Sequence, residues 1–494
     1  MRSFFTLVLS LFGVFASAQT PIAKWPLGDP VEYITFFDNG GYQKDSMFNF
    51  NYRHSNCAAF AGDSSHIFFQ CNGYRVANEQ LQIIDNGEFL ADNLFSQGRY
   101  DWGISETQGV IVVPKKNNTY WIFYLSISDS IWGQSNTSPD RLYYAIVDMN
   151  ANGGAGKVMQ KKVPLYQGMM GDCRITACKH GNGRDYWLVN HQWNNNCYNK
   201  WLVTPDTVLG PFVQCIGDIH REPDLFGMAK FSEDGTLYAM GSSNGLLDIM
   251  DFDRCTGVFS NVRAITVYTE PPYTITPAIS FITGLAFSPS SRFLYVTAFD
   301  YLLQYDLQHN PIDSSRILLA KTDSTYTNAD PLFLIYLMPN NKMLISNFQG
   351  IPASCYHIIN YPDSLGLSCN FQKEALCMPN NWAADICIPN VFNLNLGPIS
   401  GCDTFFNTIA SNTLSKRPII RSFPNPAYDY FYIELPDENE RLELTITSFS
   451  GQLILTKYFE INTMIDVRGF ESGLYFYTVK SQTSEYNGKF VVHE

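Results

Sequence analysis

The sequence has few charged residues and no concentrated block of either sign. Asp, Glu, Lys and Arg make up 16% of the 494 residues, and the net charge is -13 at pH 7. A surface that follows nucleic-acid phosphates, or that docks on an anionic membrane, needs clustered lysines and arginines. The composition therefore argues against a nucleic-acid partner and against an electrostatic membrane patch.

Long apolar runs are missing after the first eighteen residues, so no later segment is expected to span a bilayer. Residues 1–18 (MRSFFTLVLSLFGVFASA) combine an early Arg2 with a short apolar run and a small-residue ending. This pattern is typical of a cleaved secretory signal, and we expect cleavage between Ala18 and Gln19. The alternative is a transmembrane anchor, for which the apolar run is short.

The motifs C-x-x-C, H-x-H and H-E-x-x-H are also missing, which argues against the common zinc sites, and we expect no cofactor. Twelve cysteines, an even number, and an export signal favour disulfides instead. We expect pairs between cysteines that are close in the sequence, namely Cys57–Cys71, Cys355–Cys369 and Cys377–Cys387. Free buried thiols are the alternative.

Aromatic residues are abundant (15%), and Gly, Asn, Ser and Pro interrupt the chain often, a composition that favours strands and turns. Two segments, one from Gly227 and one from Gly284, share a pattern of short apolar strands and polar turns. Their phenylalanines Phe231 and Phe287 are 56 positions apart. Repeats of this length with three or four short strands indicate the blades of a β-propeller.

Weaker copies of the repeat begin near Cys57, Gln108, Arg174 and Pro331, so six copies are visible. The leading VEYITFFDNGG and the segment around Cys377 to Cys402 are expected to complete a seventh copy, closing the ring with strands from both ends. We therefore predict an all-β chain with a β-propeller over residues 19–402, of about seven blades, with six or eight as alternatives. A polar linker is expected over residues 403–418.

Residues 419–494 return to alternating apolar and polar positions, with strands expected over 429–435, 442–449, 453–459 and 474–479. Gly451 and Gly473 lie at the expected turns, where glycine tolerates positive φ. About seven short strands in such a length predict a small C-terminal β-sandwich.

This terminal module resembles the type A C-terminal sorting domain of the type IX secretion system of Bacteroidetes. The resemblance rests on five motifs in register: FPNPA with Pro424, Asn425 and Pro426, then SGQ with Gly451, IDV, SGLYF with Gly473 and Tyr475, and KFV with Lys489. It implies export through the periplasm and recognition by the outer-membrane secretion machinery. It also implies cleavage outside the cell, followed by release or attachment to surface lipopolysaccharide. A generic adhesive sandwich is the alternative.

The body of the chain resembles, more loosely, the propeller-like cargo found ahead of such sorting domains. The segments that carry this resemblance include QGVIVVPKKNNTYWIFYLS and LYYAIVDMNANGGAGKV, and FSEDGTLYAMG resembles a WD40/YVTN-type blade hairpin. The resemblance implies a fold and no particular reaction.

Two motifs of functional sites occur in segments that we expect to be hairpin turns. Residues 241–245 satisfy G-x-S-x-G, but strand-like segments lie on both sides, whereas a nucleophile elbow needs a following helix. Residues 148–153 resemble the first half of a calcium loop, but Met159 stands where a bidentate Glu belongs. Residues 232–236 read as an ordinary blade turn rather than a sialidase box.

His191 and His220 could approach each other around a channel, although solvated or turn histidines are the expectation. In the segment His191 to Trp201, three aromatic residues alternate with amides. Such groups can hold a sugar ring, but packing of the blade is the expectation. We therefore expect a secreted or cell-surface binding or adhesion module for a protein or glycan ligand. A secreted hydrolase or lyase acting on polysaccharide or peptide and a purely structural component are the alternatives.

Overall fold

The computed structural model divides into two compact units, residues 1–403 and 404–494. It describes residues 20–27, 31–45, 59–98, 103–104, 106–132, 138–171, 174–221, 227–268, 281–322, 332–347, 355–377, 388–402, 421–423, 427–434, 442–448, 452–459, 462–480 and 485–492. Each unit has its own hydrophobic core and is described by itself.

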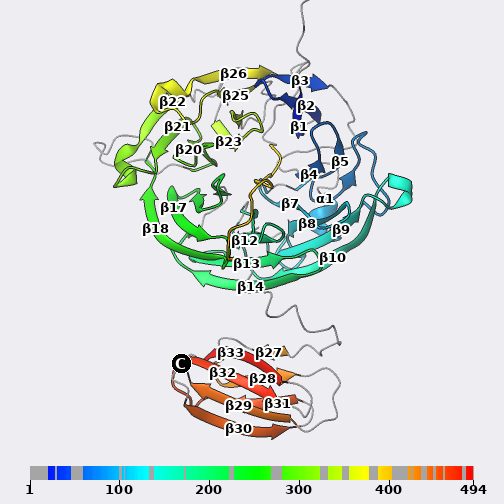
Figure 1. Cartoon of the computed structure of the whole chain (residues 1–494), viewed down its shortest axis with the longest axis vertical. Coiled ribbons are helices and arrows are strands. Elements are labelled where there is room, and N and C mark those ends of the chain that lie inside the picture. Colours follow the sequence, from blue (N-terminus) through cyan, green and yellow to red (C-terminus); the bar gives the residue numbers. More distant parts are fainter. Residues whose placement is uncertain are drawn as a thin grey trace, which may run out of the picture. The chain divides into compact units, whose positions relative to one another are not determined.

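The described part of the first unit forms seven antiparallel sheets around a common centre, the arrangement of a β-propeller (Figure 1). The strands, sheet by sheet, are β1 (Pro21–Leu27), β2 (Glu32–Phe37) and β3 (Tyr42–Asp45); β4 (Ala59–Gly62), β5 (Ile67–Cys71) and β6 (Val76–Ala77); β7 (Val110–Pro114), β8 (Thr119–Ser126), β9 (Arg141–Asp148) and β10 (Lys157–Gln167); β11 (Thr176–Lys179), β12 (Tyr186–His191), β13 (Cys197–Val203) and β14 (Val208–Cys215); β15 (Gly227–Phe231), β16 (Leu237–Ser242), β17 (Leu246–Asp253) and β18 (Val258–Thr266); β19 (Gly284–Phe287), β20 (Phe293–Ala298), β21 (Tyr301–Asp306) and β22 (Ile317–Lys321); and β23 (Leu332–Leu337), β24 (Met343–Asn347), β25 (Cys355–Ile359) and β26 (Phe371–Cys377). The predicted all-β propeller is confirmed. The number of blades stays a prediction, because two of the sheets contain three described strands each.

Helices are short in the described residues: α1 (Leu94–Gly98) and the 3-10 turns η1 (Asn152–Gly154), η2 (Ile312–Ser315) and η3 (Gly366–Cys369). Among them, none has the length and apolar character that a membrane-crossing helix requires.

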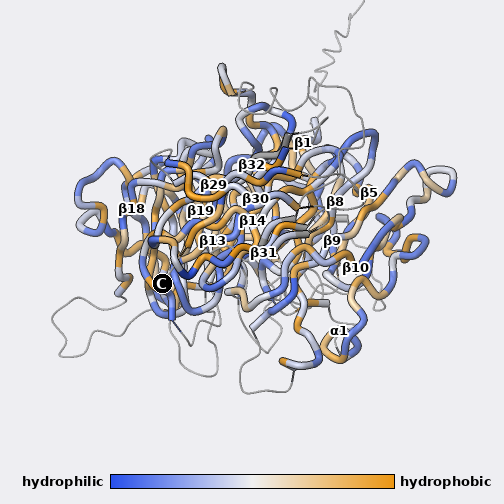
Figure 2. The backbone as a smooth tube through the Cα atoms, turned by 90° about the horizontal axis from the view of Figure 1, so that it is seen from below, coloured by the Kyte–Doolittle hydropathy of each residue, from blue (hydrophilic) through white to orange (hydrophobic). Residues whose placement is uncertain are grey.

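The ring is held by apolar side chains between neighbouring sheets. First strands follow one another around the centre, β4 beside β7, then β11, β15, β19 and β23. Because a neighbouring sheet covers each face, β12 is buried along its whole length, whereas the outer strand β14 is largely exposed. Hydrophobic stretches accordingly lie along the strands in Figure 2, and many of the connections are hydrophilic.

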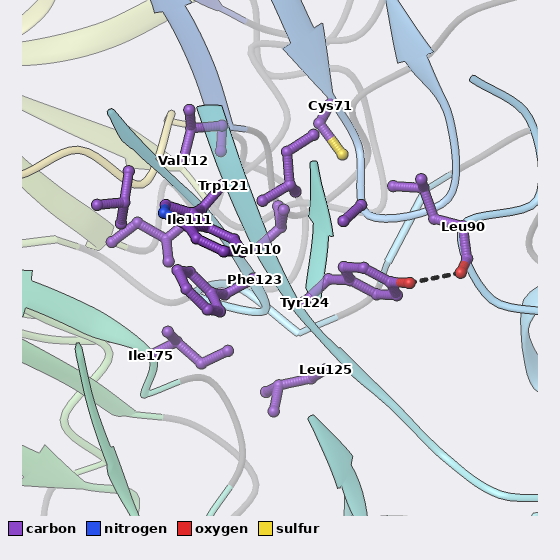
Figure 3. Packing of buried hydrophobic residues seen from close by; sticks show 14 of the residues in the cluster. Cys71, Leu90, Val110, Ile111, Val112, Trp121, Phe123, Tyr124, Leu125 and Ile175 are labelled. Carbon is purple, nitrogen blue, oxygen red and sulfur yellow. Dashed lines mark hydrogen bonds between the residues drawn. The ribbon is translucent and has the colours of Figure 1, made fainter. Parts of the chain in front are cut away.

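One close-up illustrates this packing. Trp121 and Phe123 of β8 stack with ring centroids 6.3 Å apart, and Tyr124 points toward the opposite face (Figure 3). The Tyr124 hydroxyl donates a 2.5 Å hydrogen bond to the Leu90 carbonyl, which satisfies a buried polar group in an apolar layer.

In the described residues, the ring is not closed by the expected sheet that combines strands from both ends of the propeller sequence. The leading strands form their own sheet, β1–β3, which contacts the sheets on both sides: Tyr33 Oη donates to Glu79 O at 2.7 Å, and Asn340 Nδ2 donates to Gly40 O at 3.4 Å. Residues 388–402 add no strand to it; instead, they run as an irregular segment across the middle of the ring (Figure 1). The expectation of strands from both chain ends is therefore wrong for residues 388–402, and residues 378–387 lie outside the described residues.

Disulfide pairing also differs. The described bonds are Cys197–Cys215, Cys255–Cys402 and Cys355–Cys377. The expected Cys355–Cys369 and Cys377–Cys387 pairs are wrong, because Cys355 and Cys377 lie opposite each other on β25 and β26 with Cα atoms 3.8 Å apart.

Free thiols remain at Cys71, Cys178 and Cys369, all buried. The Cys71 thiol belongs to the apolar cluster of Figure 3, and burial raises its pKa to about 12. Since Cys71 is free, the expected Cys57–Cys71 pair is not formed. Cys57 and Cys387 lie outside the described residues.

The second unit is a sandwich of two sheets. One sheet contains β27 (Arg421–Phe423), β28 (Tyr430–Glu434) and β31 (Asn462–Asp466), and the other contains β29 (Leu442–Ser448), β30 (Leu453–Phe459), β32 (Gly473–Lys480) and β33 (Glu485–Val492). Phe431 of β28 stacks on Phe490 of β33, with ring centroids 3.9 Å apart, and joins the two sheets. The predicted β-sandwich is confirmed.

Candidate functional site

A cavity of about 670 Å³ opens at one mouth of the ring. Its walls are the ends of the first strands of all seven described sheets, together with residues 390–396 of the irregular segment. The lining mixes apolar groups with hydroxyl, amide and charged groups, which include Phe60, Asp63, Tyr120, Lys230, Glu233, Tyr336 and Asn393. Concave sites with an apolar wall and a few polar groups are where proteins bind small ligands.

Residues 388–402, which we name the strap, form one wall of this cavity. Asn390 is buried and fixes the start of the strap: its Nδ2 donates to Val110 O at 3.1 Å and to Ile175 O at 2.9 Å. Gln108 Nε2 donates to Asn390 Oδ1 at 3.3 Å. At the other end, the Cys255–Cys402 disulfide ties the strap to the turn after β17.

Basic side chains of the ring hold the backbone of the strap. Lys230 Nζ donates to Val391 O at 2.8 Å, Lys179 Nζ to Leu394 O at 3.0 Å, and Arg254 to Gly397 O at 2.8 Å. A hydrogen bond from a charged donor such as the Arg254 guanidinium is stronger than one from a neutral donor. The strap is therefore fixed along most of its length, although it has no regular secondary structure.

Lys230 has the most unusual environment in the cavity. Its Nζ lies 3.6 Å from the centroid of the Tyr336 ring, in addition to the Val391 carbonyl. Burial lowers the pKa of Lys230 to about 7, because a charged ammonium loses hydration there. Burial also raises the pKa of Glu233, an effect that the nearby Lys230 partly opposes.

The turn that carries Glu233 is the expected blade turn of residues 232–236. Asp234 closes it, accepting from Ser232 Oγ at 2.6 Å and from Thr236 N at 3.0 Å. This local hydrogen bonding sets the turn and leaves Glu233 on the cavity wall.

A second polar cluster is buried between the sheets β11–β14 and β15–β18. The rings of His191 and His220 have centroids 5.2 Å apart, and His220 Nε2 is 3.1 Å from Asp248 Oδ2. Burial, with His220 and Arg174 nearby, holds the pKa of His191 well below its usual range. The two histidines do approach each other, but the expectation of solvated or turn histidines is wrong for them, because both are fully buried.

Some polar atoms in this cluster, among them His220 Nδ1 and Asp248 Oδ1, have no hydrogen-bond partner in the described part of the protein. Such atoms normally bond to ordered water. Since the side chains are fully buried, the mouth cavity is the better candidate for a ligand.

The motifs singled out in the sequence lie in turns and in the core. Residues 241–245 comprise the end of β16 and the hairpin turn to β17, with Gly245 at φ 71°, so the hairpin interpretation is confirmed. Residues 149–156 connect β9 to β10, again a hairpin, and Met159 is exposed. Among the described residues, no group of three or more His, Cys, Asp or Glu could hold a metal ion.

The aromatic segment from His191 to Trp201 serves mainly packing. Tyr198 is fully buried against Tyr238 and Phe259, and Trp201 packs on Tyr166. The sequence reasoning missed Lys230 and the strap. Lys230 lies near the end of a repeated apolar strand, and a charged residue in such a strand was the signal in the sequence that could have identified it.

In the second unit, the described residues of the sorting motifs occupy strands. Gly473 begins β32, Tyr475 is buried beside Phe490 and donates its hydroxyl to Glu471 O at 2.8 Å, and Lys489 is exposed on β33. Pro424, Asn425, Pro426 and Gly451 lie outside the described residues, as do Ala18 and Gln19.

Residues 421–493 match the model of the secretion system C-terminal sorting domain, and the match falls within the second unit. The match indicates a type IX sorting signal. It therefore supports interaction with the secretion machinery and export to the cell surface or the extracellular space. No curated protein matches the sequence.

Solved structures similar to the chain have low sequence identity. They include a proposed 6-phosphogluconolactonase from Bacteroides fragilis (9% identity, 74% of this chain and 97% of that chain, TM-score 0.44) and another from Bacteroides uniformis (11%, 74% and 98%, 0.44). A third is the β-propeller domain of Cps50 from Myceliophteria thermophila (8%, 64% and 87%, 0.37).

Proposed function

We propose that the chain is an exported binding protein whose propeller holds an extracellular protein or glycan ligand at the strap side of the ring. The observation that carries this proposal is the mouth cavity of about 670 Å³. Aromatic and amide groups on its wall, such as Tyr120 and Asn393, match the apolar faces and hydroxyls of a sugar or an extended peptide. The cleaved signal of residues 1–18, the linker of residues 403–418 and the sorting residues of 419–494 belong to the same proposal.

Ligand binding is tested with a glycan array and a pulldown from medium, using the whole exported chain. Asn395→Trp puts a large side chain on an exposed position of the strap and fills the cavity mouth. Gln372→Trp, on the exposed outer strand β26, is the matched control. We expect the strap variant to lose at least tenfold in affinity and the control to bind as wild type. Equal binding by both variants, or no ligand in either screen, would overturn the cavity as the binding site.

Export is tested by fractionating the host culture with and without residues 419–494. We expect the full chain at the cell surface or in the medium and the truncated chain inside the cell. A truncated chain that still leaves the cell would contradict the role of the sorting domain.

The alternative function is a hydrolase or lyase at the same place. The observation that favours it is the presence of two carboxyl groups, Asp63 and Glu233, among the groups that line the cavity, with the pKa of Glu233 raised by burial. Glu233→Gln would then remove turnover of the bound ligand and leave its affinity within about threefold.

A further inference from the structure

The cavity contains two lysines in contrasting environments. Lys24 Nζ forms an ion pair with Glu79 Oε1 at 2.6 Å, so its charge is compensated. Lys230 forms no ion pair with any carboxylate in the described part of the chain, and its Nζ contacts the Val391 carbonyl oxygen and the face of the Tyr336 ring. A buried ammonium without a carboxylate partner is costly, so the neutral amine is favoured.

We propose that Lys230 is a reactive amine that forms an imine with small carbonyl compounds, uncharged hydroxyaldehydes in particular, inside the mouth cavity. The cavity is large enough for such a compound, and its hydroxyl and amide groups suit the hydroxyls of the ligand. This inference uses the same cavity as the proposed function, but it requires neither export nor a glycan or protein ligand.

The geometry holds the amine in place for this reaction. One N–H of Lys230 donates to Val391 O at 2.8 Å, and the Tyr336 ring covers one side at 3.6 Å. The Val391 carbonyl takes one hydrogen of the neutral amine, so the nitrogen lone pair is not used by this bond, and Lys230 is one of the residues that line the cavity. A positioned neutral lysine is the usual nucleophile for a carbonyl carbon.

The chemical step balances without an oxidant or a reductant. The nitrogen lone pair attacks the carbonyl carbon, and a proton passes from nitrogen to the former carbonyl oxygen, giving a carbinolamine. That hydroxyl then leaves as water with a second proton, a C=N bond forms, and the nitrogen has lost both of its amine hydrogens. Water can later reverse both steps and release the carbonyl compound.

The electrostatics support the proposal. At pH 7, a pKa of about 7 leaves roughly half of the Lys230 side chains neutral. An ordinary lysine, with a pKa near 10.4, has a neutral fraction on the order of 10³-fold smaller. Glu233 raises the pKa of Lys230, so removing its negative charge is expected to make the amine more reactive at neutral pH.

The first experiment measures the pH dependence of acetylation by trace acetic anhydride on the full wild-type chain, with peptides read by mass spectrometry. We expect a midpoint near pH 7 for Lys230, well below the ordinary lysine range. Glu233→Gln is expected to move the Lys230 midpoint downward. A Lys230 midpoint in the ordinary lysine range would overturn the proposal. Because this measurement uses the wild-type chain, it does not depend on whether variants at position 230 fold.

The second experiment adds glycolaldehyde and cyanoborohydride at pH 7, which converts an imine to a stable amine. We expect at least tenfold more adduct on Lys230 than on Lys24, and no adduct at position 230 in Lys230→Arg. Lys24→Arg is the matched control and keeps the Lys230 adduct. Label spread evenly over the lysines would overturn the proposal and leave Lys230 as a support for the strap. Failure of the glycan and pulldown screens would leave this result unaffected.

Discussion

Two lysines in the ring are held by one or two hydrogen bonds each. Lys230 donates to the carbonyl of Val391, and Lys200 donates to the side chain of Gln214 and to the carbonyl of Gly257. Burial lowers the pKa of Lys200 to about 8, the same direction as for Lys230. Lys200 connects two neighbouring sheets and Lys230 connects a sheet to the strap, so the protonation of both side chains is coupled to the stability of the ring.

His191 gives a prediction for acid conditions. Its pKa in the folded protein is well below 6.5, because burial, His220 and Arg174 all disfavour the imidazolium. In the unfolded chain the His191 imidazole binds a proton as pH falls through about 6.5. The unfolded state is therefore stabilised relative to the folded state below that pH. We expect the His191 contribution to the free energy of unfolding to be level above about pH 7.5. It should fall by up to about 1.4 kcal/mol per pH unit from pH 6.5 toward 5.5.

Urea unfolding of wild type and His191→Gln at pH 7.5 and 5.5 measures this loss. The variant removes the titrating group, so its stability should fall less between the two pH values, whatever its stability at pH 7.5. His66→Gln is the control, because His66 is exposed and lies beside Asp63 at the surface. The same loss in His191→Gln as in wild type would contradict the assignment to His191.

The cysteines show which residue-scale features the sequence could not predict. Short spacing in the sequence suggested Cys355–Cys369, but the bond depends on strand register, which puts Cys355 opposite Cys377. The same register relation joins Cys197 to Cys215 across β13 and β14. Cys255 and Cys402 are 147 positions apart and meet only because the strap crosses the ring.

At the scale of elements, the strap is the unusual part of the ring. It contains no regular strand, and its backbone carbonyls accept hydrogen bonds from side chains of three different sheet and turn segments. Buried backbone groups must be paired, so these side chains replace the hydrogen bonds that a sheet would supply. The position of the strap therefore depends on the side chains of a few residues, whereas a blade is held by backbone hydrogen bonds along all of its strands.

Asn390 is the residue on which the strap depends most. Asn390→Ala leaves the carbonyls of Val110 and Ile175 without their side-chain donor in a buried place. We expect a loss of about 2–4 kcal/mol in the free energy of unfolding, because the variant loses the buried hydrogen bonds of Asn390 to Gln108, Val110 and Ile175, each worth about 0.5–1.5 kcal/mol. Urea unfolding measures the loss, and Asn395→Ala, at an exposed position of the strap, should change stability by less than about 0.5 kcal/mol. Similar values for the two variants would show that the amide of Asn390 does not anchor the strap.

The blades could be predicted from the sequence and the strap could not. Strands such as β15 to β17 repeat a pattern that returns in β19 to β21, and these strands are short apolar runs because both of their faces are buried. The strap has no such period, because its buried atoms are amide and backbone groups with partners far away in the chain. The candidate cavity was missed for the same reason: its wall comes from seven sheets and the strap together.

At the scale of the whole molecule, the two units have separate cores and separate tasks. The sandwich buries Phe431, Phe490 and Tyr475 in its own cluster, without residues from the ring. The sorting-domain match at 421–493 falls within this unit, and the mouth cavity falls within the other. A change in the core of the sandwich should therefore alter export and leave the ring unaffected.

Phe431→Ala tests this separation. Phe431 is 1% exposed and stacks on Phe490 at 3.9 Å, so its truncation should cost the sandwich about 3–5 kcal/mol. Tyr432→Ala is the matched control. Tyr432 is the next residue after Phe431 in β28, so its side chain points to the opposite face of the strand, and it is 37% exposed. We expect culture fractionation with immunoblots to show Phe431→Ala retained in the cell and Tyr432→Ala exported. The purified Phe431→Ala chain should keep wild-type His191-dependent unfolding of the ring, since the two cores share no residue. Export of Phe431→Ala at the wild-type level, with its sandwich unfolded, would mean that the secretion machinery reads the sorting segment as a linear sequence rather than as a folded domain.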